Sequence, residues 1–125
     1  IIRILMDELW KVILYRSPSG DHPVQQFIDG LEIKAQSKIQ DAIKLLREFG
    51  IRLGPPHVKK LTGTDLWELR ILGSDSIRVL YVAVTGKTFV LLHGFKKKKD
   101  KTPPKEIKIA ENRLAELRSR VKLED

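Results

Sequence analysis

Residues 66–94, LWELRILGSDSIRVLYVAVTGKTFVLLHG, decide the fold because they hold three consecutive strand patterns. Leu66–Leu72 alternates apolar side chains with Glu68 and Arg70, as a half-buried strand does. Ser76–Val84 is apolar on both faces except at Arg78, which is typical of a central strand. A hairpin-length turn joins it to the third run, Thr88–Gly94. We therefore expect an antiparallel meander.

Helical patterns flank this meander on both sides. Pro23 suits the first turn of a short helix that breaks near Gly30, with Asp21 as a nearby cap. Residues 32–50 carry apolar side chains at three- and four-residue steps, which predicts an amphipathic helix that Gly50 closes. Thr102-Pro103-Pro104 opens a last helix, whose apolar stripe is Ile107, Ala110, Leu114, Leu117 and Val121.

The remaining segments complete a small α+β domain. Leu9–Arg16 is rich in branched and aromatic residues and predicts a first strand, whereas Ile51–Leu61, with its Gly-Pro-Pro, predicts a loop. The expected order is β-α-α-β-β-β-α, a mainly antiparallel sheet packed by helices. We expect one domain over residues 1–125. Met6 is the only methionine, so residues 1–5 are expected to be an extension before the natural start.

The composition excludes several classes of protein. The chain has 125 residues and no cysteine, so it has no disulfide framework, thiolate metal site or cysteine nucleophile. No apolar run approaches the length that spans a bilayer. These features fit a cytoplasmic protein without a membrane segment.

The net charge of +8 is confined to one part of the chain. Residues 51–105 hold twelve Lys or Arg against four Asp or Glu, whereas residues 1–50 and 106–125 are each balanced. A segregated positive field attracts polyanions, and nucleic acid is the commonest of them. The alternative is a lopsided charge distribution that serves no partner.

The sequence lacks the usual catalytic motifs but gathers basic groups near strand ends. It contains no Walker loop, GxGxxG or GxSxG, and its three histidines are not at metal-ligand spacing, so we expect no metal and no cofactor. A meander would bring Arg70 and Arg78 beside His93 and Lys96. Such a cluster suits a phosphodiester, because guanidinium groups pair with phosphate oxygens and stabilise developing negative charge.

Each of these residues also has a structural interpretation. Arg78 could pair with Glu68 or extend to the rim of the sheet, and His93 could be a satisfied histidine at a strand end. Phe95 could meet a base or anchor the loop that follows it. The lysine run 96–99 could be solvated charge, while Trp67, Tyr81 and Phe89 are expected in the core.

Four short motifs follow one another through the basic region. They are KLTG at 60–63, WELR at 67–70, RVLY at 78–81 and LLHGFKKK at 91–98. Together they resemble the RelE/ParE superfamily of bacterial toxins, and most closely its phage-derived HigB-like branch. The resemblance covers about Trp10–Leu114, and it implies a RelE-like fold.

The resemblance implies the toxin of a type II toxin–antitoxin pair. Relatives of the RelE type are endoribonucleases that cleave mRNA in the ribosomal A site without a metal and so inhibit translation. The implied catalytic residues are Arg70, Arg78, His93, Lys96 and Lys97. The implied RNA contacts are Lys59, Lys60, Phe95, Lys98, Lys99 and Lys101. The implied partners are mRNA, the ribosome and an antitoxin with a helix-turn-helix domain.

Two departures from the RelE pattern bear on the mechanism. Some members use a tyrosine near the last helix, but here no tyrosine follows Tyr81, and Pro103-Pro104 occupies that region. Glu68 replaces a basic residue of the RelE strand, and it could orient Arg70 or act as a weak base. Two rival functions stay open: a ParE-like toxin that poisons DNA gyrase without nuclease activity, and a non-catalytic RNA-binding module.

Overall fold

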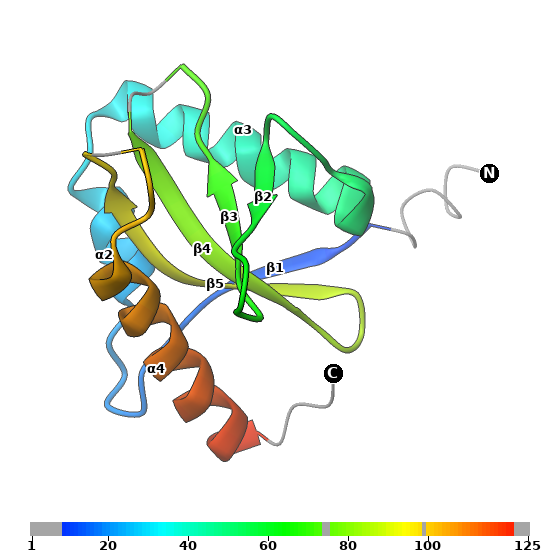
Figure 1. Ribbon diagram of the computed structural model, residues 1–125, viewed down its shortest axis with the longest axis vertical. Helices are drawn as coiled ribbons and strands as arrows, with labels where there is room; N and C mark the ends of the chain where they lie inside the picture. Colours follow the sequence, from blue (N-terminus) through cyan, green and yellow to red (C-terminus); the bar gives the residue numbers. More distant parts are fainter. Residues whose placement is uncertain (1–8, 74–75, 99, 122–125) are drawn as a thin grey trace.

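The computed structural model describes residues 9–73, 76–98 and 100–121. Within them a five-stranded sheet has the strand order β1-β5-β4-β3-β2 (Figure 1). The parallel pair is β1 with β5, and the other neighbours are antiparallel. The strands are β1 (Lys11–Leu14), β2 (Val58–Lys60), β3 (Trp67–Arg70), β4 (Ile77–Val84) and β5 (Thr88–Lys96). The predicted α+β class and the meander are confirmed.

Helices in the described residues cover both faces of the sheet (Figure 1). They are α2 (Pro23–Asp29), α3 (Ile33–Phe49) and α4 (Pro104–Val121). The α2–α3 face is formed where Ile39 and Leu46 of α3 pack with Val79 of the sheet. The α4 face is formed on the other side, where Leu114 packs with Leu80. None of the described helices is long and apolar enough to cross a membrane.

Local sequence explains most element boundaries. Pro23 occupies the first turn of α2, as expected, but the N-cap is His22, and Asp21 instead accepts a hydrogen bond from Ser19. Gly50 ends α3 with a φ of 58°, a conformation that favours glycine. The expectation for residues 1–5 and Met6 lies outside the described residues.

Two expected segments differ from the structure. The first strand is shorter than Leu9–Arg16, because only Lys11–Leu14 is paired with β5. The expected loop Ile51–Leu61 contains a 3₁₀ turn (η1, Gly50–Arg52) and the edge strand β2. Strand β2 has three residues, too few for an alternating pattern to show, and it is held by pairing with β3.

A β-bulge between β4 and β5 sets the orientation of the end of β5. His93 is opposite Leu80, but Leu91 is opposite the next residue, Tyr81, so the register shifts by one. Leu91 packs on the α2–α3 face, whereas Phe95 packs on the α4 face and His93 bonds to α4. The bulge therefore places His93 and Phe95 on the same face as Arg78, which is opposite Phe95.

Candidate functional site

Two arginines of the meander lie side by side on the α4 face of the sheet. Arg70 ends β3 and is the direct partner of Arg78 near the start of β4. Glu68 lies two residues before Arg70, so strand alternation places its side chain on the same face. The adjacency expected for Arg70 and Arg78 is confirmed.

Glu68 is the centre of a cluster of charges. Its side chain is fully buried, and its Oε1 lies 3.4 Å from Arg78 Nε and 3.7 Å from Arg70 Nε. Lys97 Nζ approaches the same oxygen at 4.0 Å. The hydroxyl of Thr102 donates a hydrogen bond to the other oxygen, Oε2. We call Glu68, Arg70, Arg78, Lys97 and Thr102 the cation cluster.

Charge attraction, more than hydrogen bonding, holds this cluster. Within the described part of the chain, Glu68 Oε1 and the Nε atoms of both arginines are buried without a hydrogen-bond partner. The arginine side chains remain 32% and 20% exposed for Arg70 and Arg78, so solvent reaches them. Three positive groups share one carboxylate, which leaves a local excess of positive charge at the surface. Glu68 is buried, so its carboxylate faces its cationic partners and not the solvent, an arrangement that favours the orienting role over that of a base.

His93 is held between β5 and α4 and is not part of the cation cluster. Its Nε2 lies 2.8 Å from Glu106 Oε1, and Arg113 Nη1 lies 3.2 Å from its Nδ1. Because arginine only donates, Nδ1 must accept, and the proton therefore resides on Nε2 and is donated to Glu106. Burial lowers the pKa of His93 below its usual value and so favours this neutral form. The hydrogen bond with Glu106 acts in the opposite direction but does not outweigh burial.

Arg113 and Glu106 are site-adjacent residues that sequence reasoning missed. Arg113 also donates to the Leu92 carbonyl at 2.8 Å, which ties α4 to the bulge in β5. The two residues are seven positions apart on α4, a spacing that puts them on one helix face. The seven-residue spacing predicts that Glu106 and Arg113 share a helix face, but nothing in the sequence indicates that this face contacts His93.

Phe95 does not present a face to a base in this structure. The side chain is 5% exposed, it belongs to the α4-face cluster, and its ring stacks on His93 with centroids 5.5 Å apart. The structure therefore favours the anchoring interpretation of Phe95, and its contact with RNA stays a prediction. Trp67, Tyr81 and Phe89 pack in or against the α2–α3 core, as expected.

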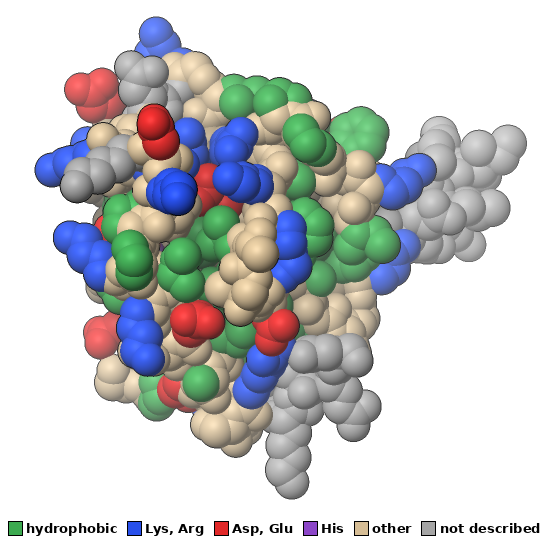
Figure 2. Space-filling model, in the orientation of Figure 1, with side chains coloured by type: hydrophobic (Ala, Val, Ile, Leu, Met, Phe, Trp, Pro, Cys, Tyr) green, Lys and Arg blue, Asp and Glu red, His purple; other side chains and the backbone are tan. Residues whose placement is uncertain are grey.

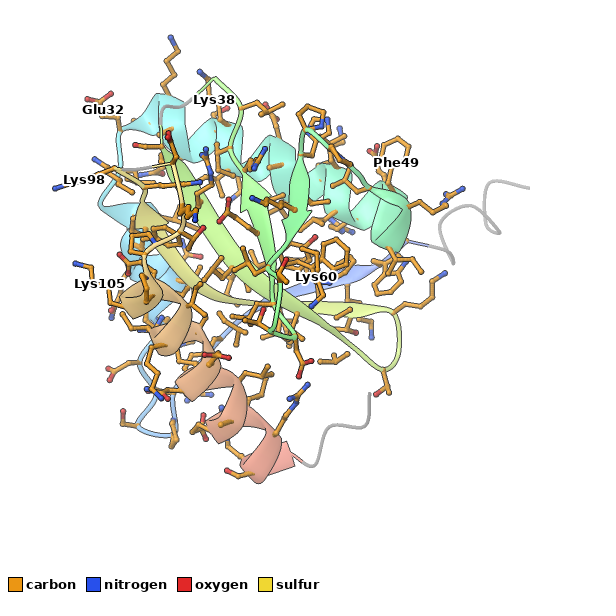
Figure 3. All side chains as sticks on the ribbon, viewed as in Figure 1. Glu32, Lys38, Phe49, Lys60, Lys98 and Lys105 are labelled. Carbon is orange, nitrogen blue, oxygen red and sulfur yellow. The ribbon has the colours of Figure 1, made fainter. Side chains whose placement is uncertain are left out.

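The predicted lysines separate into distinct places. Lys96 ends β5 opposite Ile77, which packs on the α2–α3 face. Directly opposed residues share a face, so the exposed side chain of Lys96 leaves the strand on the face away from Arg78. Lys98 and Lys101 are exposed in the segment that leads to α4. Figure 3 shows Lys98 near Lys105 at the left edge of the view. The expectation for Lys99 falls outside the described residues.

Lys59 and Lys60 lie on the edge strand β2, away from that segment. Figure 3 shows Lys60 near the middle of the view, well apart from Lys98 and Lys105. Lys60 bonds to the Thr64 carbonyl and lies 5.9 Å from the centre of the Trp67 ring. Figure 2 shows further basic side chains gathered where β5 leads into α4. Lys59 is the direct partner of Glu68 across β2 and β3, so the lysines of β2 border the cation cluster although they lie apart from Lys98 and Lys105.

The chain matches the model of a family described as Phage derived protein Gp49-like (DUF891). The match spans residues 26–115, which includes all four sequence motifs and every residue of the cation cluster. No curated protein matches the chain at a significant level. Among the described residues, no group of three or more His, Cys, Asp or Glu side chains could hold a metal ion.

Proposed function

The chain belongs to the Gp49-like family of phage-derived proteins, a family related to the toxins of toxin–antitoxin systems, and from this premise we propose that it is an mRNA endoribonuclease. It would be the toxin of a type II pair of the HigB-like branch, cutting mRNA on the ribosome and so stopping translation. The observation that carries the proposal is the convergence of Arg70, Arg78 and Lys97 around Glu68.

The cation cluster suits the transition state of RNA cleavage. Arginine presents a planar set of donors that matches two phosphate oxygens, and both arginines extend from paired strands that fix their spacing. Donors held in place before the reaction stabilise the negative charge that develops on the phosphorus oxygens. The single carboxylate below them is buried, so it orients the arginines without competing for their exposed edges.

RNA supplies the nucleophile for this reaction. The 2′-oxygen attacks the adjacent phosphorus and the bond from phosphorus to the 5′-oxygen breaks, which leaves a 2′,3′-cyclic phosphate and a 5′-hydroxyl. The 2′-hydroxyl gives its proton to solvent, and the 5′-oxygen receives one from Lys97. Lys97 is assigned this role because arginine does not release its proton and the Nε2 proton of His93 is held by Glu106.

The proposal includes partners and a location. The exposed lysines beside α4 and on β2 would contact the phosphate backbone of mRNA or ribosomal RNA. A cognate antitoxin, with a helix-turn-helix domain in the proposed branch, would neutralise the toxin in the cytoplasm.

Mapping mRNA ends by primer extension after induction tests the proposed cleavage. Arg78→Ala should lower cleavage by about 100-fold or more, the usual effect of removing one donor at a developing anion. Arg78→Lys tests whether the planar guanidinium, and not only its charge, is needed. The matched control is Lys44→Ala, which removes one exposed charge from α3 on the opposite side of the sheet.

Three outcomes would decide against the proposal. Wild-type cleavage by a folded Arg78→Ala protein would show that the cation cluster is not the catalytic site. If DNA replication stops before protein synthesis, the gyrase-poisoning alternative is favoured. If the protein binds RNA and leaves it intact, it is a binding module.

A further inference from the structure

A hollow of about 480 Å³ lies beside the cation cluster, where the segment after β5 enters α4. Its apolar part includes Pro103 and Pro104, and its lining includes four lysines: Lys96, Lys98, Lys101 and Lys105. On the left of the view in Figure 2, hydrophobic side chains lie among basic ones. A volume of this size is within the range of small-ligand sites.

Two lining residues connect the hollow to the groups already described. Thr102 lines it and donates to Glu68, the centre of the cation cluster. Glu106 lines it and accepts the hydrogen bond from His93. A group that occupied the hollow would therefore lie next to a phosphate held by Arg70 and Arg78.

The lining fits one chemical class. Proline rings and the methylene stems of lysines provide an apolar surface for a flat ring, and the lysine ammonium groups suit phosphates on either side of it. Glu106 adds an acceptor at the wall: its Oε1 is engaged with His93, and no hydrogen bond from the described residues reaches its Oε2. A flat ring that carries hydrogen-bond donors and is flanked by phosphates is a nucleotide in single-stranded RNA.

We infer that this hollow holds the base next to the cleaved phosphate, and that Glu106 selects bases that carry an exocyclic amino group. Adenine, cytosine and guanine each have such an amino group, whereas uracil has none. A carboxylate accepts from the amino group of cytosine in known base contacts, and the same geometry serves the other two. The inference rests on the proposed action on RNA, and it adds a preference for sequence.

Binding of RNA that cannot be cut separates this inference from the nuclease proposal. Four 2′-O-methylated pentanucleotides UUXUU, with X as A, C, G or U, lack the attacking hydroxyl and are titrated into ¹⁵N-labelled protein by NMR. We expect amide shifts at Lys98, Lys101, Thr102 and Glu106. Binding of X = A, C or G should be about tenfold tighter than binding of X = U, the discrimination of one good base contact.

Substitutions assign the selection to its residue. Glu106→Gln keeps the size and can still accept from His93, but its free amide group is a donor, so the preference for amino bases should disappear or reverse. Glu111→Gln is the matched control, because it removes an exposed carboxylate further along α4. Lys105→Ala should weaken all four pentanucleotides alike and reduce the salt dependence.

The inference is overturned if the four pentanucleotides bind equally, if none binds at millimolar concentration, or if Glu106→Gln keeps the preference. Shifts that appear only around β2 would also overturn it. If base-selective binding is seen but mRNA is not cut in cells, the hollow is a base site and the nuclease proposal fails. If mRNA is cut but the four pentanucleotides bind without selection, the nuclease proposal stands and the inferred base site fails.

Discussion

Replacing Glu68 with glutamine should reveal how much of the fold depends on one buried carboxylate. The substitution keeps the volume and the position of Oε1, but it removes the negative charge that faces Arg78 at 3.4 Å and Arg70 at 3.7 Å. Two guanidinium groups on adjacent strands then repel each other without a counter-ion between them. The cation cluster should therefore oppose folding in the variant.

The expected loss follows from the burial of Glu68. Unit charges about 4 Å apart interact by about 4 kcal/mol at an effective dielectric constant near 20, but the desolvation of each group offsets much of this. Breaking a buried pair by removing one partner costs about 3–5 kcal/mol, and we expect the lower end because both arginines are partly solvated. A domain of this kind is stable by about 5–15 kcal/mol, so the variant should fold but with a much reduced margin.

Urea unfolding at neutral pH, followed by circular dichroism, measures this loss. The double variant Glu68→Gln with Arg78→Gln should recover part of it, because one of the two facing cations is then gone. Glu111→Gln serves as the control for losing a carboxylate at an exposed position. A Glu68→Gln protein that unfolds within about 0.5 kcal/mol of the wild type would refute the view that Glu68 holds the cluster together.

Two further predictions concern the faces of β5. Because burial lowers the folded-state pKa of His93 below the unfolded value near 6.5, the unfolded state binds the extra proton first, and stability should fall as pH falls below about 6.5. Urea midpoints between pH 7.5 and 5.5 should show this loss in the wild type and less of it in His93→Gln; equal slopes would contradict it. Gly94→Val should destabilise by about 1–3 kcal/mol, because a Cβ at Gly94 would come within 2.4 Å of the Phe27 ring. Gly54→Ala, at a glycine whose Cβ would meet nothing within 4 Å, is the control, and equal thermal midpoints for the two variants would show that β5 and α2 can separate.

The sequence predicted those features of the fold that depend on local periodicity and turn residues. The three strands of the meander, the amphipathic pattern of α3 and the proline start of α4 are all local signals, and the structure confirms them. The adjacency of Arg70 and Arg78 followed as well, because a short loop between antiparallel strands leaves few possible registers. Edge strand β2 was not predicted, because its pairing depends on β3 and not on its own three residues.

The orientation of the end of β5 could not be predicted from alternation. A regular strand from Phe89 would place His93 and Phe95 on the α2–α3 face, together with Leu91. The bulge opposite Leu80 and Tyr81 reverses them, and no residue in the run marks where it occurs. This reversal is why Phe95 packs on the α4 face and why His93 meets Glu106. Arg78 is on that face already, through the regular alternation of β4.

The count of charges in the cation cluster bears on whether it serves structure or function. An ion-pair network that evolved for stability alone gains most when each buried cation has its own carboxylate, because uncompensated like charges repel. Here Arg70, Arg78 and Lys97 share Glu68, and the other contact of that carboxylate among the described residues is with the neutral Thr102. An anion bound at the exposed edges of the arginines would relieve the repulsion that remains. On our proposal the arrangement costs stability in the free protein and would return it on binding a phosphate, since a ligand that binds only the folded state stabilises it.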